Sequence, residues 1–144
     1  MGWRWLAVLL LFLLPQVAAG EQAVVYIGPD DGGAYRVDGR LNGEPVRFVV
    51  DTGASMVAIS ERLAVRAGIQ YRQGLRVRVP AGGGAITGYR TRVERLSVGG
   101  LERQDVALVV MEGRLPGEPV LGMSFLGRVR MRSVGSTLLL QAPN

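Results

Sequence analysis

The 144-residue chain contains no cysteine, no histidine and no lysine. The missing cysteines and histidines exclude disulfides, thiol nucleophiles, metal sites built from these residues and every Ser-His-Asp triad. The missing lysines exclude Schiff-base chemistry and the lysine of a phosphate-binding loop. An enzyme of this composition must use carboxylates, tyrosines or arginines as its acids and bases, and paired carboxylates are the central candidates. No metal or organic cofactor is implied.

All 17 basic residues are arginines, against 12 acidic residues, and the net charge is +5. Such an excess suits an anionic partner, for example a nucleic acid or a membrane surface. Here the arginines alternate with other residues, as in Arg76–Arg78 and Arg128–Arg132, which is typical of solvated strand faces. Runs of five like charges are missing and aromatic residues are too few to stack bases, so we expect no nucleic-acid partner.

The first twenty residues have the layout of a secretory signal peptide. Arg4 supplies an early positive charge, residues 6–14 form an apolar run ended by a proline, and residues 17–19 are small, as a signal peptidase requires. The run is shorter than the ~20 residues that usually span a membrane. We therefore expect export, with residues 1–20 as a signal peptide or an N-terminal membrane anchor. Residues 21–144 would form one domain, periplasmic or anchored facing the periplasm, with possible membrane association through the N-terminal segment.

Glycine is abundant, at 21 residues, and long apolar heptads are missing, which favours short strands and turns over a helical bundle. Asn42-Gly43 lies between two strand-like segments and is the strongest short hairpin signal. Ser60 can cap a short helix that ends at Gly68. We expect an all-β domain with one or two short helices, the second over residues 123–126. The expected strands cover residues 23–27, 35–41, 46–50, 56–59, 75–79, 86–98, 106–111, 128–132 and 137–141.

An Asp-Thr-Gly-Ala-Ser sequence at residues 51–55 directly follows the apolar residues 48–50. Three apolar residues in a row predict a strand buried on both faces, from which Asp51 would enter a sharp, buried turn. Gly53 permits the turn, and the Thr52 hydroxyl can lock it from inside. A carboxylate in this position is suited to catalysis. The alternative interpretation of Asp51 is an ordinary, solvated acidic residue in a turn.

Peptide hydrolysis without a metal or a covalent nucleophile needs a water molecule held between two carboxyl groups. One carboxyl is ionised and takes the proton of the water, and the other is protonated and donates to the carbonyl oxygen, because neighbouring carboxyls do not both ionise readily. The chain has one Asp-Thr-Gly, since Asp38-Gly39 lacks the threonine. The simplest partner for Asp51 is its own copy across a two-fold axis, so we expect a homodimer. The terminal segments 23–27 and 137–141 are candidates for its interface.

Three segments together carry a family resemblance. Asp51-Thr52-Gly53-Ala54-Ser55 resembles the signature of aspartic proteases, and residues 120–126 resemble the second block of that family. The glycine-rich Ala81-Gly82-Gly83-Gly84 lies between them, where the family has its flap. The chain thus resembles the single-domain, retropepsin-like aspartic proteases of the exported bacterial branch, over about residues 35–140. The resemblance implies a closed β-barrel and an aspartic endopeptidase that acts on peptide or protein substrates.

The resemblance also implies roles for individual residues. Asp51 would activate the water, Thr52 would interlock with its twin across the dimer axis, and Gly53 would present its backbone near the substrate. Ala54 and Ser55 complete the turn, where the Ser55 hydroxyl can bond a carboxylate or simply the backbone.

Two further segments receive roles from the resemblance. Leu121 and Gly122 would pack beneath the active-site turn, and residues 81–84 would form a mobile flap tip that closes over an extended peptide. That tip lacks an aromatic residue, and Tyr89 lies further along the chain, which leaves the substrate preference open. A plain flexible hairpin loop is the alternative for the tip, and ordinary core packing for Leu121 and Gly122.

Two other functions stay open at this point. A catalytically silent exported β domain would keep the protease-like fold for binding or assembly, and it would be indifferent to Asp51→Ala. An anion-binding module would use its arginines, and its binding would depend strongly on salt.

Overall fold

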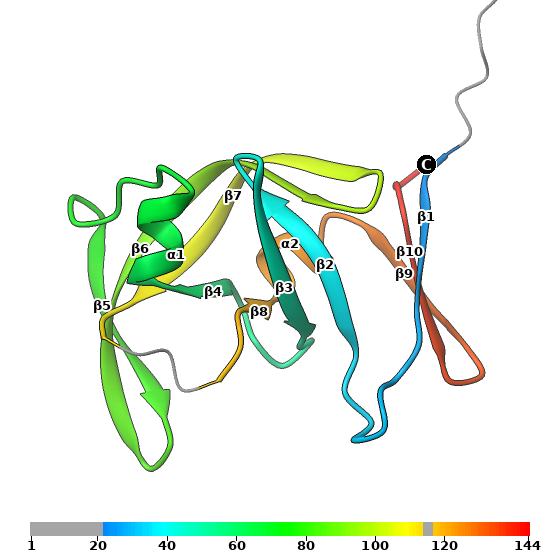
Figure 1. Ribbon diagram of the computed structural model, residues 1–144, viewed down its shortest axis with the longest axis horizontal. Helices are drawn as coiled ribbons and strands as arrows, with labels where there is room; N and C mark the ends of the chain where they lie inside the picture. The colour runs from blue at the N-terminus through cyan, green and yellow to red at the C-terminus, as the bar shows by residue number, and fades with distance from the viewer. Residues whose placement is uncertain (1–21, 114–116) are drawn as a thin grey trace, which may run out of the picture.

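The computed structural model describes residues 22–113 and 117–144, in which ten strands and two short helices follow one another (Figure 1). In chain order these elements are β1 Val24–Ile27, β2 Arg36–Leu41, β3 Glu44–Val50, β4 Val57–Ser60, α1 Glu61–Arg66, β5 Leu75–Ala81, β6 Gly84–Val98, β7 Leu101–Met111, β8 Val120–Leu121, α2 Met123–Leu126, β9 Arg130–Val134 and β10 Thr137–Gln141. The predicted signal peptide, residues 1–20, lies outside the described residues and stays a prediction. Within the described ranges, no helix has the length and apolar composition needed to cross a membrane.

The main sheet has seven strands in the order β2-β3-β8-β4-β7-β6-β5. β2 also pairs with β6, through residues 39–41 and 96–98, so six strands close into a ring and β5 is left at an edge. Gly39 makes this closure possible, because a β-carbon there would lie 2.6 Å from the Ser97 carbonyl oxygen. The prediction of an all-β, closed-barrel fold with short helices is confirmed.

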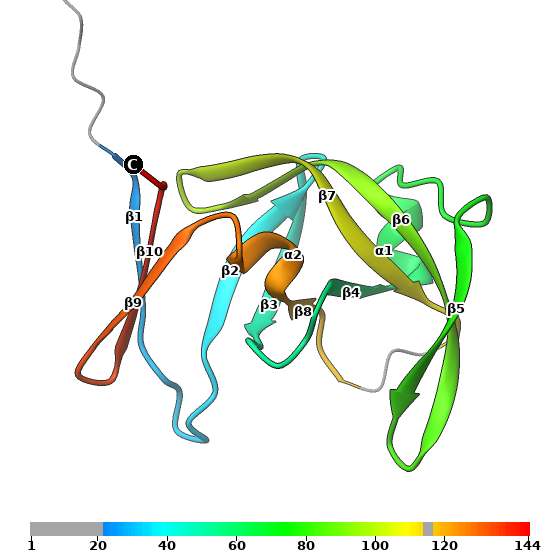
Figure 2. The same ribbon diagram turned by 180° about the vertical axis from the view of Figure 1, so that it is seen from behind.

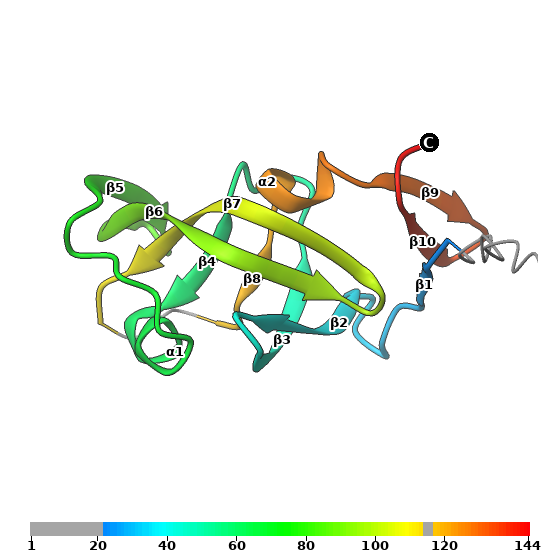
Figure 3. The ribbon, with the colours of Figure 1, turned by 90° about the horizontal axis from the view of Figure 1, so that it is seen from above.

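The two predicted helices and the first hairpin form where their sequence signals lie. The Ser60 hydroxyl accepts a hydrogen bond from the Leu63 N–H at 3.2 Å and so caps α1, which is followed by Gly68 with φ +66°. Asn42 and Gly43 both have positive φ, at 49° and 87°, which a tight two-residue hairpin turn requires. Seen from above, α1 and α2 lie on opposite sides of the sheet (Figure 3).

A second sheet contains three strands in the order β1-β10-β9 and lies to one side of the main sheet (Figure 1). Val24 to Ile27 pair with Gln141 to Leu138, antiparallel and within the same chain. The terminal strands predicted for a dimer interface therefore pair with each other. Because β10 is paired on both sides, its backbone has no free edge for a second copy, whereas β1 and β9 each keep one.

Several strands differ from their predicted bounds. β7 begins at Leu101 and not at residue 106, because its polar first half pairs with β6 along the outside of the sheet. β5 runs on to Ala81 and β6 begins at Gly84, so the connection between the strands predicted at residues 75–79 and 86–98 is a turn of only two residues. β9 is shifted two residues toward the C-terminus of its predicted position.

Candidate active site

The turn after β3 holds Asp51 through the backbone. The Asp51 N–H donates to the Leu121 carbonyl oxygen of β8 at 3.1 Å, and the Ala54 N–H donates to the Asp51 carbonyl oxygen at 3.3 Å. The Asp51 carboxylate oxygen Oδ1 accepts from the Gly53 N–H at 2.8 Å. A β-carbon on residue 53 would stand only 3.1 Å from that oxygen, so glycine lets the backbone approach the carboxylate closely.

The segment after β8 packs against the inner side of this turn, and Figure 2 shows β8 and α2 next to the β3–β4 turn. The Met123 N–H donates to the Ala54 carbonyl oxygen at 2.8 Å. Gly122 lies against the backbone of Met56 and Ala54, where even a methyl group would meet carbonyl oxygens. Leu121 is completely buried. The predicted supporting residues Leu121 and Gly122 therefore lie beneath the turn, and Gly122 is required there by space.

Ser124 is a supporting residue that sequence reasoning did not single out. Its hydroxyl oxygen accepts a hydrogen bond from the N–H of Val57 at 3.0 Å and so ties α2 to the start of β4. Val57 is completely buried, so its N–H has no access to water if the serine is removed. Ser124 lies within residues 120–126, the segment that resembles the second family block. Its hydrogen-bond partner lies 67 positions earlier in the chain, so the bond could not be predicted from the local sequence.

Asp51 is exposed in the single chain, as are Thr52, Gly53 and Ser55. The prediction of a buried turn is wrong for the isolated chain, and so is the prediction that residues 48–50 are buried on both faces. Phe48 is buried, but Val49 and Val50 are only half-buried. At the end of β3 the described part of the chain covers these two side chains only in part, and Val50 packs against the edge of the core.

A cleft of about 560 Å³ opens beside the turn. Its floor is apolar, and Asp51 is the one acidic side chain among the described residues that line it. β5 contributes five consecutive residues, Val77 to Ala81, because the cleft follows the free edge of this strand. Arg78 and Arg90 are the two cationic residues among the described residues that line the cleft. The remaining lining residues are Gly53, Ala54, Ser55, Met56, Ala58, Val109, Met111 and Val120.

The structure brings most of the predicted site residues to this cleft. Asp51, Gly53, Ala54, Ser55 and Ala81 line it, and Leu121 and Gly122 lie beneath the turn. Thr52 is exposed next to the cleft but does not line it.

The predicted flap is the tip of the β5–β6 hairpin, which points to the same side of the molecule as the β3–β4 turn, downward in Figure 1. Gly82 and Gly83 form its two-residue turn, with φ of 56° and 83°, a conformation that glycine adopts without strain. They and Gly84 are exposed and do not line the cleft in this conformation.

Tyr89 does not line the cleft either, so it does not supply the aromatic group that the flap tip lacks. Its hydroxyl donates to the Glu112 carboxylate at 2.9 Å, and its ring centre lies 5.7 Å from that of Tyr71. The hydrogen bond to Glu112, aided by partial burial of the ring, raises the pKa of Tyr89. Tyr89 is thus a structural residue at the base of the hairpin.

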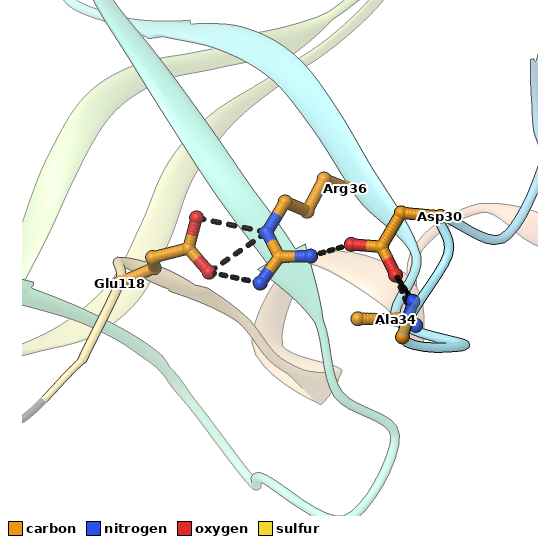
Figure 4. Close-up of polar contacts among 5 residues, drawn as sticks. Asp30, Ala34, Arg36 and Glu118 are labelled. Carbon is orange, nitrogen blue, oxygen red and sulfur yellow. Dashed lines mark hydrogen bonds and ion pairs between the residues drawn. The ribbon is translucent and has the colours of Figure 1, made fainter.

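An arginine between two carboxylates braces the strands that lead to Asp51 (Figure 4). Arg36, at the start of β2, pairs with Asp30 and donates through Nε to both oxygens of Glu118, at 2.9 and 2.8 Å. The bond to Arg36 lowers the pKa of Glu118. Glu118 precedes Pro119, whose carbonyl oxygen accepts from the Val49 N–H at 2.8 Å. This cluster, which sequence reasoning missed, fixes β2 and the approach to β8 on either side of β3.

The described residues contain no group of three acidic side chains that could hold a metal ion. What the site offers is one carboxylate on a rigid turn, at the edge of an apolar cleft bordered by a hairpin and a free strand edge. With the closed sheet, this arrangement defines the class of retropepsin-like aspartic proteases.

Residues 37–128 match the family described as "gag-polyprotein putative aspartyl protease", and the chain belongs to this family. A retropepsin-like aspartic protease from Rickettsia conorii superposes with a TM-score of 0.71 over 85% of this chain and 91% of that one, at 24% identity. The protease of EIAV, solved with the inhibitor HBY-793, superposes with a TM-score of 0.53 over 64% of this chain and 84% of that one, at 18% identity. These structural matches establish the fold. Comparison with curated protein sequences gave no match.

Proposed function

We propose that the protein is an aspartic endopeptidase that works as a homodimer, with Asp51 of each copy as the catalytic carboxylate. The observation that carries this proposal is the position of Asp51. Backbone hydrogen bonds on both sides fix it at the cleft, and it is the one acidic side chain among the described lining residues. Hydrolysis by carboxylates needs two of them, so a second copy has to supply the other.

In the proposed mechanism a water molecule lies between the two Asp51 carboxyl groups. Because like charges at close range oppose each other, the pair holds one proton in its active state, and the two macroscopic pKa values belong to the pair. The ionised carboxylate takes a proton from the water as the oxygen attacks the peptide carbonyl carbon. The protonated carboxyl donates its proton to the carbonyl oxygen, which gives a neutral tetrahedral diol. The diol then collapses, and the amine leaves as it is protonated.

The substrate is proposed to bind as an extended peptide along β5. This strand is the open edge of the main sheet, and five of its consecutive residues line the cleft. An unpaired strand edge offers N–H and C=O groups to a peptide backbone, while pockets between side chains select the sequence. The Ala81–Gly84 tip, with its two glycines of positive φ, would close over the bound peptide and exclude water.

The exposure of the active-site turn agrees with a dimer. Asp51, Thr52 and Gly53 are all exposed in one copy, and a two-fold axis passing near them would bury both turns against each other. Thr52, which lies beside the cleft, is then placed to contact its twin. Export through the N-terminal segment, with the enzyme periplasmic or anchored, is a separate proposal that rests on the sequence alone.

The experiment that tests the proposal is digestion of a mixed peptide library by the wild-type protein and by Asp51→Asn, from acidic to neutral pH. We expect cleavage with a bell-shaped pH profile, lost by at least a thousandfold in the variant, on the order of the loss of other catalytic groups. The variant is nearly isosteric, and its amide oxygen can still accept from the Gly53 N–H, so its unfolding midpoint should stay close to that of the wild type. Equal cleavage by both proteins would overturn the role of Asp51. A folded wild-type dimer that cleaves nothing at any pH would favour the silent binding domain.

A further inference from the structure

Arg90 breaks an otherwise apolar row that crosses the floor of the cleft. In register it pairs with Val109 of β7, which pairs with Ala58 of β4, which pairs with Val120 of β8. Directly paired residues on neighbouring strands share one face of a sheet, and all four residues line the cleft. Arg90 is therefore a cation on the face proposed to bind the substrate, and the sequence analysis did not single it out.

Arg78 approaches the same cleft from β5. It lies between Val77 and Val79 on the strand whose free edge borders the cleft, and all three residues line it. Side chains alternate between the two faces of a strand, so Arg78 lies on one face of β5 and its two valine neighbours lie on the other. A peptide bound along the edge of β5 would extend the sheet and meet Arg78 on one of its faces and the valines on the other. Two arginines thus flank the space proposed for the substrate.

Neither arginine is committed to another group in the described part of the chain. No ion pair or side-chain hydrogen bond is formed there by Arg78 or Arg90, and both are exposed. In the same part, acidic side chains pair with other arginines, namely Arg36, Arg47, Arg66, Arg72 and Arg92. Among the described lining residues, the cleft consequently has two available guanidinium groups and one acidic residue, Asp51. Guanidinium groups bind carboxylates through paired hydrogen bonds.

We propose that Arg78 and Arg90 make the cleft selective for peptides with acidic side chains close to the cleaved bond. This inference rests on the proposed function for the cleavage step, whereas the binding of acidic peptides by the cleft can be measured without cleavage. In a two-fold dimer each arginine occurs twice, so the preference falls on both sides of the cleaved bond. The apolar part of the floor would take apolar side chains, which gives substrates that combine acidic and apolar residues near the cleaved bond.

The cleavage test uses pairs of peptides that contain a cleaved sequence and differ only by Glu or Gln at one position near the cut. Measured at about pH 6, where glutamate is ionised, kcat/KM of the wild-type protein should be about three- to tenfold higher for the Glu peptide, the range that two exposed charge contacts provide. The preference should shrink from low to high salt, because exposed charges are screened. In the double variant Arg78→Gln/Arg90→Gln the two peptides should be cleaved at similar rates.

Arg95→Gln is the matched control, because Arg95 is exposed on the same strand β6 and lies outside the cleft lining. It removes one positive charge from β6, as the Arg90→Gln substitution does, and should keep the wild-type ratio of kcat/KM for the Glu and Gln peptides. Unfolding midpoints of all variants establish that they fold. The inference is overturned if the wild-type protein cleaves the Glu and Gln peptides with equal kcat/KM, or if the double variant keeps the wild-type preference for the Glu peptide. Loss of the ratio in Arg95→Gln also overturns it, since net charge alone would then explain the preference.

A binding experiment separates failure of this inference from failure of the proposed function. Labelled peptides of alternating Val and Glu, or Val and Gln, are titrated with the Asp51→Asn protein, alone and combined with the two arginine substitutions. If the wild type cleaves no peptide, but binding favours the Glu peptide and depends on the arginines, the cleft selects acidic peptides and the protease proposal fails. If peptides are cleaved but neither cleavage nor binding distinguishes Glu from Gln, the protease proposal stands and the selectivity is overturned.

Discussion

Gly122 lies so close to Met56 that a β-carbon on Gly122 would stand 2.3 Å from the Met56 carbonyl oxygen. The atom it would meet is backbone, in the turn that carries the site, so relief requires the turn itself to move. We expect Gly122→Ala to lower the free energy of unfolding by about 2–4 kcal/mol and to reduce peptide cleavage more than this destabilisation explains. Urea unfolding measures the first effect and kcat the second.

Gly28→Ala is the control for that substitution. Gly28 has no atom within 4 Å of the position that its β-carbon would take, so stability should stay within about 0.5 kcal/mol of wild type. A Gly122→Ala protein as stable and active as Gly28→Ala would contradict the close fit beneath the turn.

Ser124→Ala should destabilise the protein through the backbone of β4. The substitution leaves the N–H of the buried Val57 without its acceptor, at a cost of about 1–3 kcal/mol. Chemical denaturation compares this variant with Ser133→Ala, in which an exposed serine of β9 is changed. Equal unfolding midpoints for the two variants would show that the Ser124 hydroxyl does not hold β4.

Glu118 makes the stability of the folded protein depend on pH, and the direction of this dependence follows from its lowered pKa. The bond to Arg36 holds the pKa of folded Glu118 below its ordinary value of 4.5. Below about pH 4.5, Glu118 becomes protonated in the unfolded chain but stays ionised in the folded protein. The stabilisation by the Arg36–Glu118 pair is therefore fully present above this pH and is lost as the pH falls through the pKa of folded Glu118. We expect Glu118→Gln to be less stable than wild type at pH 7, and the difference to shrink as the pH is lowered.

Thermal unfolding from neutral to acidic pH measures that difference. Glu94→Gln is the control, since Glu94 is exposed and forms no ion pair within the described residues. A gap between wild type and Glu118→Gln that stays constant down to strongly acidic pH would rule out Arg36–Glu118 as its source.

Mixing wild-type and Asp51→Asn chains tests whether the two carboxylates come from two copies. If dimers exchange freely, an equal mixture should lose about half of the activity per wild-type chain, because mixed dimers hold one aspartate. Titration at fixed wild-type concentration, with exchange checked by labelled chains, supplies the measurement. If the activity per wild-type chain does not change when the variant is added and the chains exchange, one chain is sufficient for catalysis.

Local signals in the sequence predicted the elements that depend on a few neighbouring residues. Asn42-Gly43 specified its hairpin because both positions need positive φ, and Ser60 specified the start of α1 because its hydroxyl meets an N–H three residues later. The position of Asp51 after an apolar strand was predicted for the same kind of reason. Its burial was predicted wrongly, because burial depends on what packs over β3 and not on the strand itself.

Contacts between distant residues escaped prediction. The Arg36–Glu118 pair joins positions 82 residues apart, and neither residue carries a local mark that distinguishes it from a solvated charge. The alternating arginines were interpreted as solvated strand faces, and no signal singled out Arg90, which the order of β4, β7 and β8 brings onto the floor of the cleft. Charge alternation along one strand indicates exposure and does not reveal which surface that strand will border.

The closure of β2 onto β6 leaves β5 as the open edge of the main sheet, and an open strand edge attracts other strands, including β5 of another molecule. Arg76 and Arg78 lie on this edge strand. When two copies of β5 approach antiparallel, four guanidinium groups gather along the new seam and repel one another. A peptide with acidic side chains meets no such repulsion, so Arg78, which we propose helps to select the substrate, would also oppose pairing of β5 with β5 of another molecule.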